Sequence, residues 1–139
     1  MKTYKSIAVL LCMLAWTSCA TTKSAADQSA TAQQHKVEYI QHGRASWYSI
    51  GTNGGTRTAS GRKLSNDGLT AAHKTLPLGS TVKVTNTNNG KSEVVTITDR
   101  GPYVRGRIID LTIGTAKRLG FVRSGTAPVT VEVLVSKKS

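Results

Sequence analysis

Asp99 is the carboxylate whose surroundings best suit acid–base chemistry. It follows the apolar run from Val94 to Thr98 and precedes Arg100-Gly101-Pro102. A side chain at the end of a strand, beside a Gly-Pro turn, is held by rigid backbone yet open to a cleft. The alternative is structural, because an aspartate at a turn also accepts hydrogen bonds from its own downstream amides. In the first interpretation the carboxyl group can donate a proton and later take one back.

Asp110 and His73 are two further candidates for acid–base work. Asp110 lies between Ile109 and Leu111 in an apolar run, so it is either buried and hydrogen-bonded or exposed at a groove as an acid. Desolvation raises the pKa of a carboxyl group, which is the shift that a general acid needs. Asp110 is therefore a secondary catalytic candidate. His73 ends the run Leu69-Thr70-Ala71-Ala72, and a lone histidine is more often structural than catalytic.

The elements that must position these side chains are mostly strands. Apolar residues alternate with polar ones around Val82 and Val84, around Val95 and Ile97, and from Val129 to Val135. This period of two predicts half-buried strands. The segment Asn86-Thr87-Asn88-Asn89-Gly90 predicts a hairpin, and Gly51 to Gly55 predicts a flexible loop.

One helix is expected from Ile113 to Leu119. Thr112 can cap its start, and Gly120 stands at the stop position. Many short strands with a single helix favour a small barrel over a doubly wound sheet.

Four motifs occur in unbroken order over residues 43 to 135. They are Gly43-Arg44-Ala45-Ser46-Trp47-Tyr48-Ser49, Leu69-Thr70-Ala71-Ala72-His73-Lys74-Thr75-Leu76-Pro77-Leu78-Gly79, Asp99-Arg100-Gly101-Pro102 and Arg107-Ile108-Ile109-Asp110-Leu111. With these motifs the chain resembles the rare lipoprotein A family of peptidoglycan lytic transglycosylases. The resemblance implies a mainly β fold, a six-stranded double-psi β-barrel with one short helix, over residues 43–136.

The resemblance also implies an activity, the endolytic cleavage of peptidoglycan glycan strands that leaves 1,6-anhydro-muramic ends. In the family, the aspartate at the position of Asp99 belongs to the active site. A histidine at the position of His73 lies in the same cleft, where it orients Asp99 or contacts the sugar. A single carboxylate can act first as acid and then as base, unlike the paired carboxylates of hydrolases. We therefore predict Asp99 and His73 as the catalytic residues, with no cofactor.

The chain departs from the family pattern between the first two motifs. Thr58-Ala59-Ser60-Gly61 is followed by Arg62 and then by Ser65, near positions where the family has Glu and Asp. Asp67 is the nearest acidic residue, but Ser65-Asn66-Asp67-Gly68 is typical of an ordinary turn. This departure favours an alternative function, a non-catalytic, expansin-like module that binds cell-wall glycan.

Aromatic and basic residues near the motifs are candidates for glycan binding. Trp47, Tyr48 and Tyr103 can stack on sugar faces, or they can fill the core, and we expect one of the three to be buried. Arg100 and Arg107 can bind glycan carboxylates through bidentate hydrogen bonds, or they can balance the charges of Asp99 and Asp110.

Residues 1–19 have the composition of a secretory signal. Lys2 and Lys5 precede an apolar stretch from Ile7 to Trp16, and Thr17-Ser18-Cys19 ends the segment. The apolar stretch is shorter than the roughly 20 residues of a membrane-spanning helix. Cys19 after small residues is typical of lipoprotein processing, in which acyl chains on the cysteine anchor the protein. Ala20 in the next position points to the outer membrane, by resemblance to Gram-negative lipoproteins, while ordinary signal cleavage, which gives a soluble secreted protein, is the alternative.

Residues 20–42 are expected to form a flexible tether. They are mostly Thr, Ser, Ala, Gln and Lys, a composition that buries too little apolar surface to fold, although Val37 to Ile40 is a candidate lead-in strand. The two cysteines, Cys12 and Cys19, both lie in the leader. We therefore expect neither an internal disulfide nor a metal site, because the histidines and carboxylates also lack ligand spacing.

The formal net charge of the whole chain is +12. Such an excess usually indicates nucleic acid as a partner, but an exported protein meets little of it, and the basic residues here are scattered. The charge therefore favours anionic cell-wall glycan or lipid headgroups, or a surface tuned for solubility. We expect a monomer.

Overall fold

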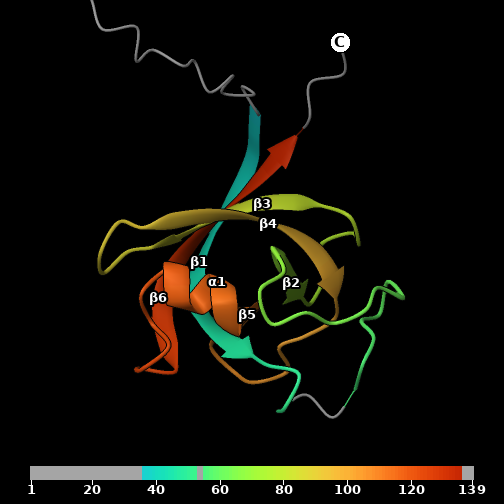
Figure 1. Ribbon diagram of the computed structural model, residues 1–139. Helices are drawn as coiled ribbons and strands as arrows, with labels where there is room; N and C mark the ends of the chain where they lie inside the picture. The colour runs from blue at the N-terminus through green and yellow to red at the C-terminus, as the bar shows by residue number, and fades with distance from the viewer. Residues whose placement is uncertain (1–35, 53–54, 136–139) are drawn as a thin grey trace, which may run out of the picture. The chain divides into compact units, whose positions relative to one another are not determined.

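The computed structural model describes residues 36–52 and 55–135, which form six strands and one helix (Figure 1). The strands are β1 (Lys36–Tyr48), β2 (Thr70–His73), β3 (Thr81–Asn86), β4 (Ser92–Asp99), β5 (Arg107–Thr112) and β6 (Thr126–Val135), and helix α1 (Ile113–Arg118) follows β5. The strands close into a barrel in the order β1-β5-β2-β4-β3-β6. The predicted mainly β barrel with one short helix is confirmed.

The barrel mixes parallel and antiparallel pairs. β1 runs parallel to β5, and β2 runs parallel to β4, whereas the remaining neighbours are antiparallel. Parallel neighbours require crossover connections, so the chain passes over the barrel between them. The candidate motifs lie mainly in the strands: the first is in β1, the second begins just before β2 and continues past it, and the last is in β5, while Asp99 ends β4 and Arg100-Gly101-Pro102 starts the connection to β5.

The alternation in the sequence sets the inside of the barrel. Val82, Val84 and Val131 are fully buried, and their polar neighbours along the strands are partly exposed. Ile97 is also fully buried, but here the alternation ends, because Thr98 beside it is buried too. The core also contains Leu119 and Phe121 from the end of α1 and the turn after it. The barrel thus closes around β-branched side chains, which pack well on a pleated surface.

The predicted helix signals act as expected. Thr112 is the N-cap, and its side chain accepts a hydrogen bond from the backbone N–H of Thr115. Gly120 follows the helix with φ +78°, a left-handed conformation that glycine adopts at little cost. The predicted hairpin also forms, because residues 86–90 join β3 to β4.

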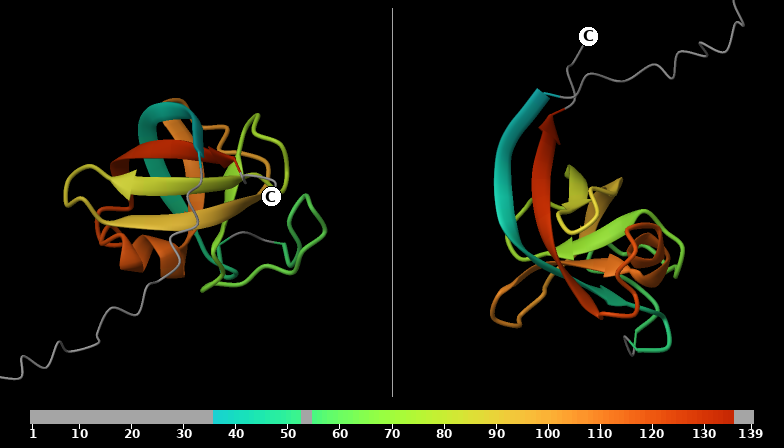
Figure 2. Two further views of the ribbon diagram at one scale, coloured as in Figure 1. Left: turned by 90° about the horizontal axis from the view of Figure 1, so that it is seen from above. Right: turned by 90° about the vertical axis from the view of Figure 1, so that its left-hand side faces the viewer.

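The folded region begins earlier than residue 43. β1 starts at Lys36, and its residues 36–42 pair with β6, from Lys36 opposite Val135 to His42 opposite Thr130. This corrects the expected tether over residues 36–42, of which only the candidate lead-in strand is retained. β1 and β6 run side by side along this ladder, which we call the arm (Figure 2), and β3 pairs with the other edge of β6 from Val129 to Leu134.

The leader and most of the expected tether lie outside the described residues, as does Cys19. Among the described residues, no helix combines the length and the apolar character needed to cross a membrane.

Candidate active site

Asp99 and Asp110 flank β2 from its two sides. Ala72 of β2 pairs with Asp110 on β5 and with Asp99 on β4. A register shift in the β2–β4 ladder leaves Thr98 without a partner position. Neighbouring strands lie roughly 4.8 Å apart, so the Cα atoms of the two aspartates are roughly 10 Å from each other. The fold therefore places both carboxylates on one stretch of barrel wall.

Asp99 has one oxygen engaged by the backbone. Its Oδ1 accepts hydrogen bonds from the N–H of Ala59 at 3.0 Å and from the N–H of Arg100 at 2.8 Å. Its Oδ2 accepts none from the described residues. The bond from Arg100 is the local turn contact that the structural alternative predicted, and the bond from Ala59 ties the long β1–β2 connection to β4. The side chain is thus oriented, and it keeps one oxygen for other chemistry.

Two open pockets are lined by Thr98, the residue before Asp99. They measure about 360 and 270 Å³ and share Arg62 and Thr98 in their walls. The remaining lining is rich in hydroxyl groups and comprises Ser60, Leu78, Gly79, Thr96 and Ile97 in the first pocket and Thr58, Lys63, Ser65, Gly68 and Thr70 in the second. We call this double pocket the groove. Asp99 is not among its lining residues but adjoins it, because Asp99 follows Thr98 and binds the N–H of Ala59, whose neighbours Thr58 and Ser60 line the two pockets.

His73 is buried and fully hydrogen-bonded. Its Nδ1 accepts from the backbone N–H groups of Thr75 at 3.2 Å and Leu76 at 3.1 Å, and its Nε2 lies 3.0 Å from Oε1 of Gln41. This pattern fits a neutral imidazole with the proton on Nε2. Burial lowers the pKa of His73, and the positive charges of Arg100 and Lys74 lower it further.

The structure does not bring His73 to Asp99. None of the hydrogen bonds that the described residues give His73 reaches that carboxylate. The link is indirect, because Nη1 of Arg100 donates to the carbonyl oxygens of His73 and Leu76 at 3.1 and 2.8 Å. His73 thus stabilises the turn from His73 to Leu76, whose carbonyl oxygens bind the Arg100 side chain. The backbone N–H of Arg100 donates to Asp99.

Asp110 is engaged on both oxygens. The hydroxyl of Ser46 donates to Oδ1, and Nη2 of Arg107 lies 3.5 Å from Oδ2. Ile109 and Leu111, on either side of it, are buried in the core, so Asp110 points to the outer face of the wall. This environment supports the hydrogen-bonded, charge-balanced interpretation of Asp110 and Arg107 over that of a free acid.

The three candidate aromatic residues have different environments. Trp47 is partly buried, packs against the core and donates from its Nε1 to the carbonyl oxygen of Val122 at 3.3 Å; none of the three is buried as a whole residue, as one of them was expected to be. Tyr103 is 80% exposed and is available to stack on a ligand.

Tyr48 lies between these extremes. Its Oη is buried and has no hydrogen-bond partner of normal geometry among the described residues. Burial raises the pKa of Tyr48, the nearby Thr70 side chain works against that rise, and the negative charges of Asp99 and Asp110 add to it. Because the phenol is near both carboxylates, it belongs to the wall of the site as a neutral group.

A family model described as "Lytic transglycolase" matches residues 40–131, which includes all the residues of this site. The chain belongs to this family. The resemblance that the four motifs indicated is therefore confirmed, and the match reaches into the arm that precedes residue 43.

Curated relatives agree with the family. The chain is 47% identical over 109 residues to the endolytic peptidoglycan transglycosylase RlpA of Neisseria meningitidis, covering 78% of the chain and 45% of the relative. It is 51% identical over 94 residues to RlpA of Pseudomonas aeruginosa, covering 68% of the chain and 27% of the relative. The chain thus spans less than half the length of these relatives.

Solved structures share the fold at low identity. The Streptomyces papain inhibitor matches with a TM-score of 0.57 at 18% identity, over 73% of this chain and 99% of that one. Apo expansin of Clavibacter michiganensis matches with a TM-score of 0.55 at 22% identity, over 73% of this chain and 52% of that one. These likenesses support the double-psi barrel of the family and no particular activity.

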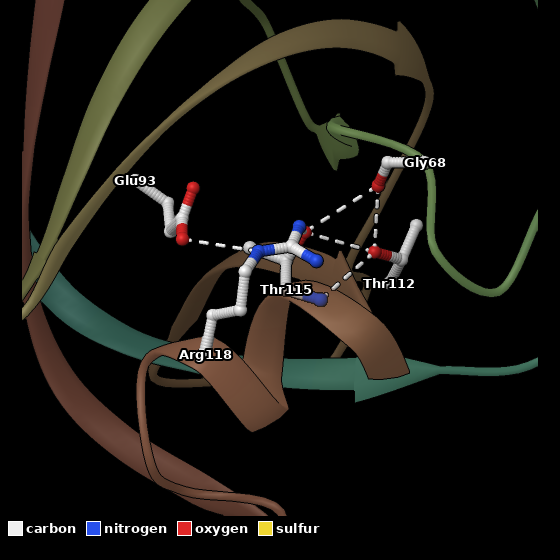
Figure 3. A network of polar contacts seen from close by, with 5 residues as sticks. All are labelled: Gly68, Glu93, Thr112, Thr115 and Arg118. Carbon is white, nitrogen blue, oxygen red and sulfur yellow. Dashed lines mark hydrogen bonds and ion pairs between the residues drawn. The ribbon is translucent and has the colours of Figure 1, made fainter.

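Within this lytic transglycolase domain, the β1–β2 connection is fixed to helix α1 (Figure 3). The hydroxyl of Thr112 donates to the carbonyl oxygen of Gly68 at 2.7 Å, and the N–H of Gly114 donates to that of Asn66 at 2.8 Å. Arg118 bonds Thr115 and Glu93, both at 3.0 Å, and so ties α1 to β4. The start of α1 therefore holds residues 66–68, which follow the groove residue Ser65.

Sequence reasoning missed Gln41, Ala59 and Thr98. Gln41 was placed in the tether, although it holds Nε2 of His73. Ala59 acts through its backbone N–H, for which a sequence carries no signal. Thr98 continues an alternating strand, and only the register shift places it in the groove wall. Among the described residues, no group of three or more His, Cys, Asp or Glu side chains is arranged to hold a metal ion.

Proposed function

We propose that this chain is a lytic transglycosylase that cleaves peptidoglycan glycan strands, with Asp99 as its acid and base. The main support for the proposal is that the two oxygens of the Asp99 carboxylate have different environments. Two backbone N–H groups fix Oδ1, while Oδ2 accepts no hydrogen bond from the described residues. One of those N–H groups belongs to Ala59, between the groove residues Thr58 and Ser60. The relatives, named as endolytic peptidoglycan transglycosylases, support the substrate.

The reaction needs one carboxyl group used twice. Protonated Asp99 donates its proton to the glycosidic oxygen, and the bond from that oxygen to C1 of the muramic sugar breaks. The carboxylate then accepts the proton of the C6 hydroxyl, whose oxygen bonds to C1 and forms the 1,6-anhydro ring. No water is consumed, so a second carboxylate to activate water is not required.

The neighbours of Asp99 suit this sequence of steps. The guanidinium of Arg100 is directed to the carbonyl oxygens of His73 and Leu76, so it does not neutralise the carboxylate. His73 acts as a positioning residue through that turn. Tyr48 and Tyr103 supply a neutral phenol in the wall and an exposed ring for the sugar.

A second candidate function is a glycan-binding module without catalysis. Arg62 favours it, because an exposed cation lines both pockets of the groove near a position where the family pattern has an acid. Such a module keeps the shape of the groove and loses bond cleavage.

Asp99→Asn separates the two functions. The substitution keeps the shape of the side chain and removes the titratable proton, so the rate of cleavage should fall by about 10²- to 10⁴-fold, while binding persists. Glycan strands are incubated with each protein, and anhydro-muramic ends are counted by mass spectrometry. Asp110→Asn is the matched control and should retain most of the activity.

Two results would decide against the proposal. If the wild type binds glycan but yields no new ends, the binding module is the correct function. If the wild type cleaves and Asp99→Asn is unaffected while Asp110→Asn is inactive, the roles of the two carboxylates are reversed.

We also propose that the protein is held at the cell envelope, at the outer membrane, by lipid on Cys19. The small residues before Cys19 support this, as does a polar segment after it that is long enough to reach from a membrane. Cys19→Ala should move the protein from the membrane fraction to the soluble fraction of the native host. Unchanged fractionation with membranes would contradict the anchor.

A further inference from the structure

The smaller pocket of the groove has the chemistry of an anion site. Arg62 and Lys63 line it together with hydroxyl side chains, and no carboxylate is among its lining residues. The nearest acidic residue along the loop, Asp67, lies against α1, because its Oδ1 would be 2.7 Å from a Cβ placed on Gly114. The pocket is therefore positive and is open to a ligand of about the size of a sugar residue.

Arg62 is held by its backbone and not by its charge. Its carbonyl oxygen accepts from the N–H of Thr58 at 2.8 Å and from the Thr58 hydroxyl at 3.2 Å. Among the described residues the ion pairs join Lys83 to Glu132, Arg107 to Asp110 and Arg118 to Glu93, so the guanidinium of Arg62 has no carboxylate partner there. The backbone of Arg62 is therefore held in place, while its guanidinium is available to bind a ligand.

Ser65 supplies a second donor in the same pocket. Its Oγ accepts a weak hydrogen bond from the N–H of Asp67 at 3.4 Å, which leaves its own proton free to donate. A guanidinium with a hydroxyl donor beside it matches the two oxygens of a carboxylate.

We propose that this pocket is a subsite for a carboxylate carried by the glycan strand. The inference rests on the proposed function for its substrate and deepens it, because it assigns Arg62, Lys63 and Ser65 to one chemical group. A neutral sugar offers these two cations hydrogen-bond acceptors but no opposite charge, whereas a carboxylate offers both. A carboxylate next to the bond that Asp99 attacks would fix the register of the strand in the groove.

The test measures binding, so that it does not depend on cleavage. All proteins carry Asp99→Asn, which keeps bound glycan intact, and Arg62→Gln/Lys63→Gln is compared with Lys117→Gln/Arg123→Gln. The control pair removes the same two charges from a different pocket, which Lys117 and Arg123 line with Gly120 and Val122. The probes are peptide-free glycan oligosaccharides, the same oligosaccharides with their carboxylates reduced to alcohols, and peptide-bearing oligosaccharides.

The protein with Asp99→Asn alone should bind the peptide-free oligosaccharide about tenfold more tightly than the same oligosaccharide with its carboxylates reduced to alcohols. This is the difference expected for a charge-assisted hydrogen-bonded pair in an open site. Arg62→Gln/Lys63→Gln should abolish this difference, and Lys117→Gln/Arg123→Gln should retain it. If reduction changes nothing but peptide-bearing probe binds more tightly in an Arg62-dependent way, the carboxylate comes from the peptide and the subsite stands.

Three results would overturn the subsite. They are equal affinity for all probes, a preference that survives Arg62→Gln/Lys63→Gln, and no binding of any probe. A failure of the proposed function would look different, because the wild type would then show the carboxylate preference and release no anhydro ends.

Discussion

At the scale of single residues, His73 makes stability depend on pH. Its pKa in the folded protein is lowered from 6.5 by burial and by Arg100 and Lys74, so the unfolded chain takes up the proton first as the pH falls. The stabilisation is complete above pH 6.5 and is lost below it, at a rate of at most about 1.4 kcal/mol per pH unit. Denaturant unfolding between pH 7.5 and 5.5 should show this slope.

His73→Gln should lower stability at pH 7.5 and flatten the slope over this range. His42→Gln is the control, because it removes an exposed histidine from β1, and it should keep the slope. A slope that remains in His73→Gln would show that another group is responsible.

Tyr48 gives a second prediction for a single residue. Its buried Oη has no hydrogen-bond partner of normal geometry among the described residues, although the Thr70 side chain is near it, and an unsatisfied buried hydroxyl costs about 1–3 kcal/mol. Tyr48→Phe should therefore leave the free energy of unfolding unchanged or raise it by about 1 kcal/mol. A loss of stability on urea unfolding would reveal a partner for this phenol.

Residue roles were predictable where they depend on local sequence and not where they depend on distant contacts. The position of Asp99 at the end of β4 was predictable from the strand before it and the turn after it, whereas its catalytic role came from the family resemblance and stays a prediction. The pairing of His73 with Asp99 was not found, because the partner of His73 is Gln41, 32 positions away, in a segment whose composition is typical of a tether.

At the scale of elements, Gly114 sets the contact between α1 and the groove wall. A Cβ at this position would lie 2.8 Å from the carbonyl oxygen of Asn66 and 2.9 Å from Cα of Asp67. Gly114→Ala should cost about 1–3 kcal/mol through overpacking, more than the up to 1 kcal/mol that alanine gains over glycine in a helix.

The expected result of Gly114→Ala is a lower melting temperature and weaker glycan binding, since the turn that leads to Arg62 must move. Gly68→Ala is the control on the same turn. Its Cβ would meet nothing closer than 3.5 Å, so its melting temperature should match that of the wild type. Equal melting temperatures for both variants would show that the turn adapts freely.

Elements with a clear period or cap were predictable from sequence. β3, β4 and β6 follow the alternation of valine and isoleucine with polar residues, and Thr112 and Gly120 mark the ends of α1. In the first half of β1 only the candidate strand from Val37 to Ile40 was predicted, and the continuous strand through residue 42 was not, because the residues from Lys36 to Ile40 are exposed and the segment has the composition of a tether. The register shifts in β1 and β2 also leave no mark in the sequence.

At the scale of the whole molecule, the arm is part of the folding unit. A chain that begins at Gly43 loses the pairing of residues 36–42 with β6 and the bond from Gln41 to His73. It should be less stable than a chain that begins at Lys36 by about 1–3 kcal/mol. Urea unfolding of the two chains measures the difference, and equal midpoints would show that the arm contributes nothing.

The strand order could not be derived from the pattern alone. Period two identifies strands but does not say which ones are neighbours, and here β5 lies between β1 and β2 while β4 lies between β2 and β3. The family resemblance supplied this topology. The approach of Asp99 to Asp110 depends on it, because both pair with Ala72 from opposite sides of β2.

The antiparallel arm of β1 and β6 also decides how the domain responds to mechanical force. Lys36 and Val135 face each other at the free end of this ladder. A force that separates these two residues acts perpendicular to the strands. It therefore breaks the hydrogen bonds of one residue pair at a time, starting at the free end of the ladder. The same pull along the strands would load all pairs together. Tension applied through both ends should therefore open the barrel at its β1–β6 seam at low force, and Gln41 would release His73 before the wall between Asp99 and Asp110 is disturbed.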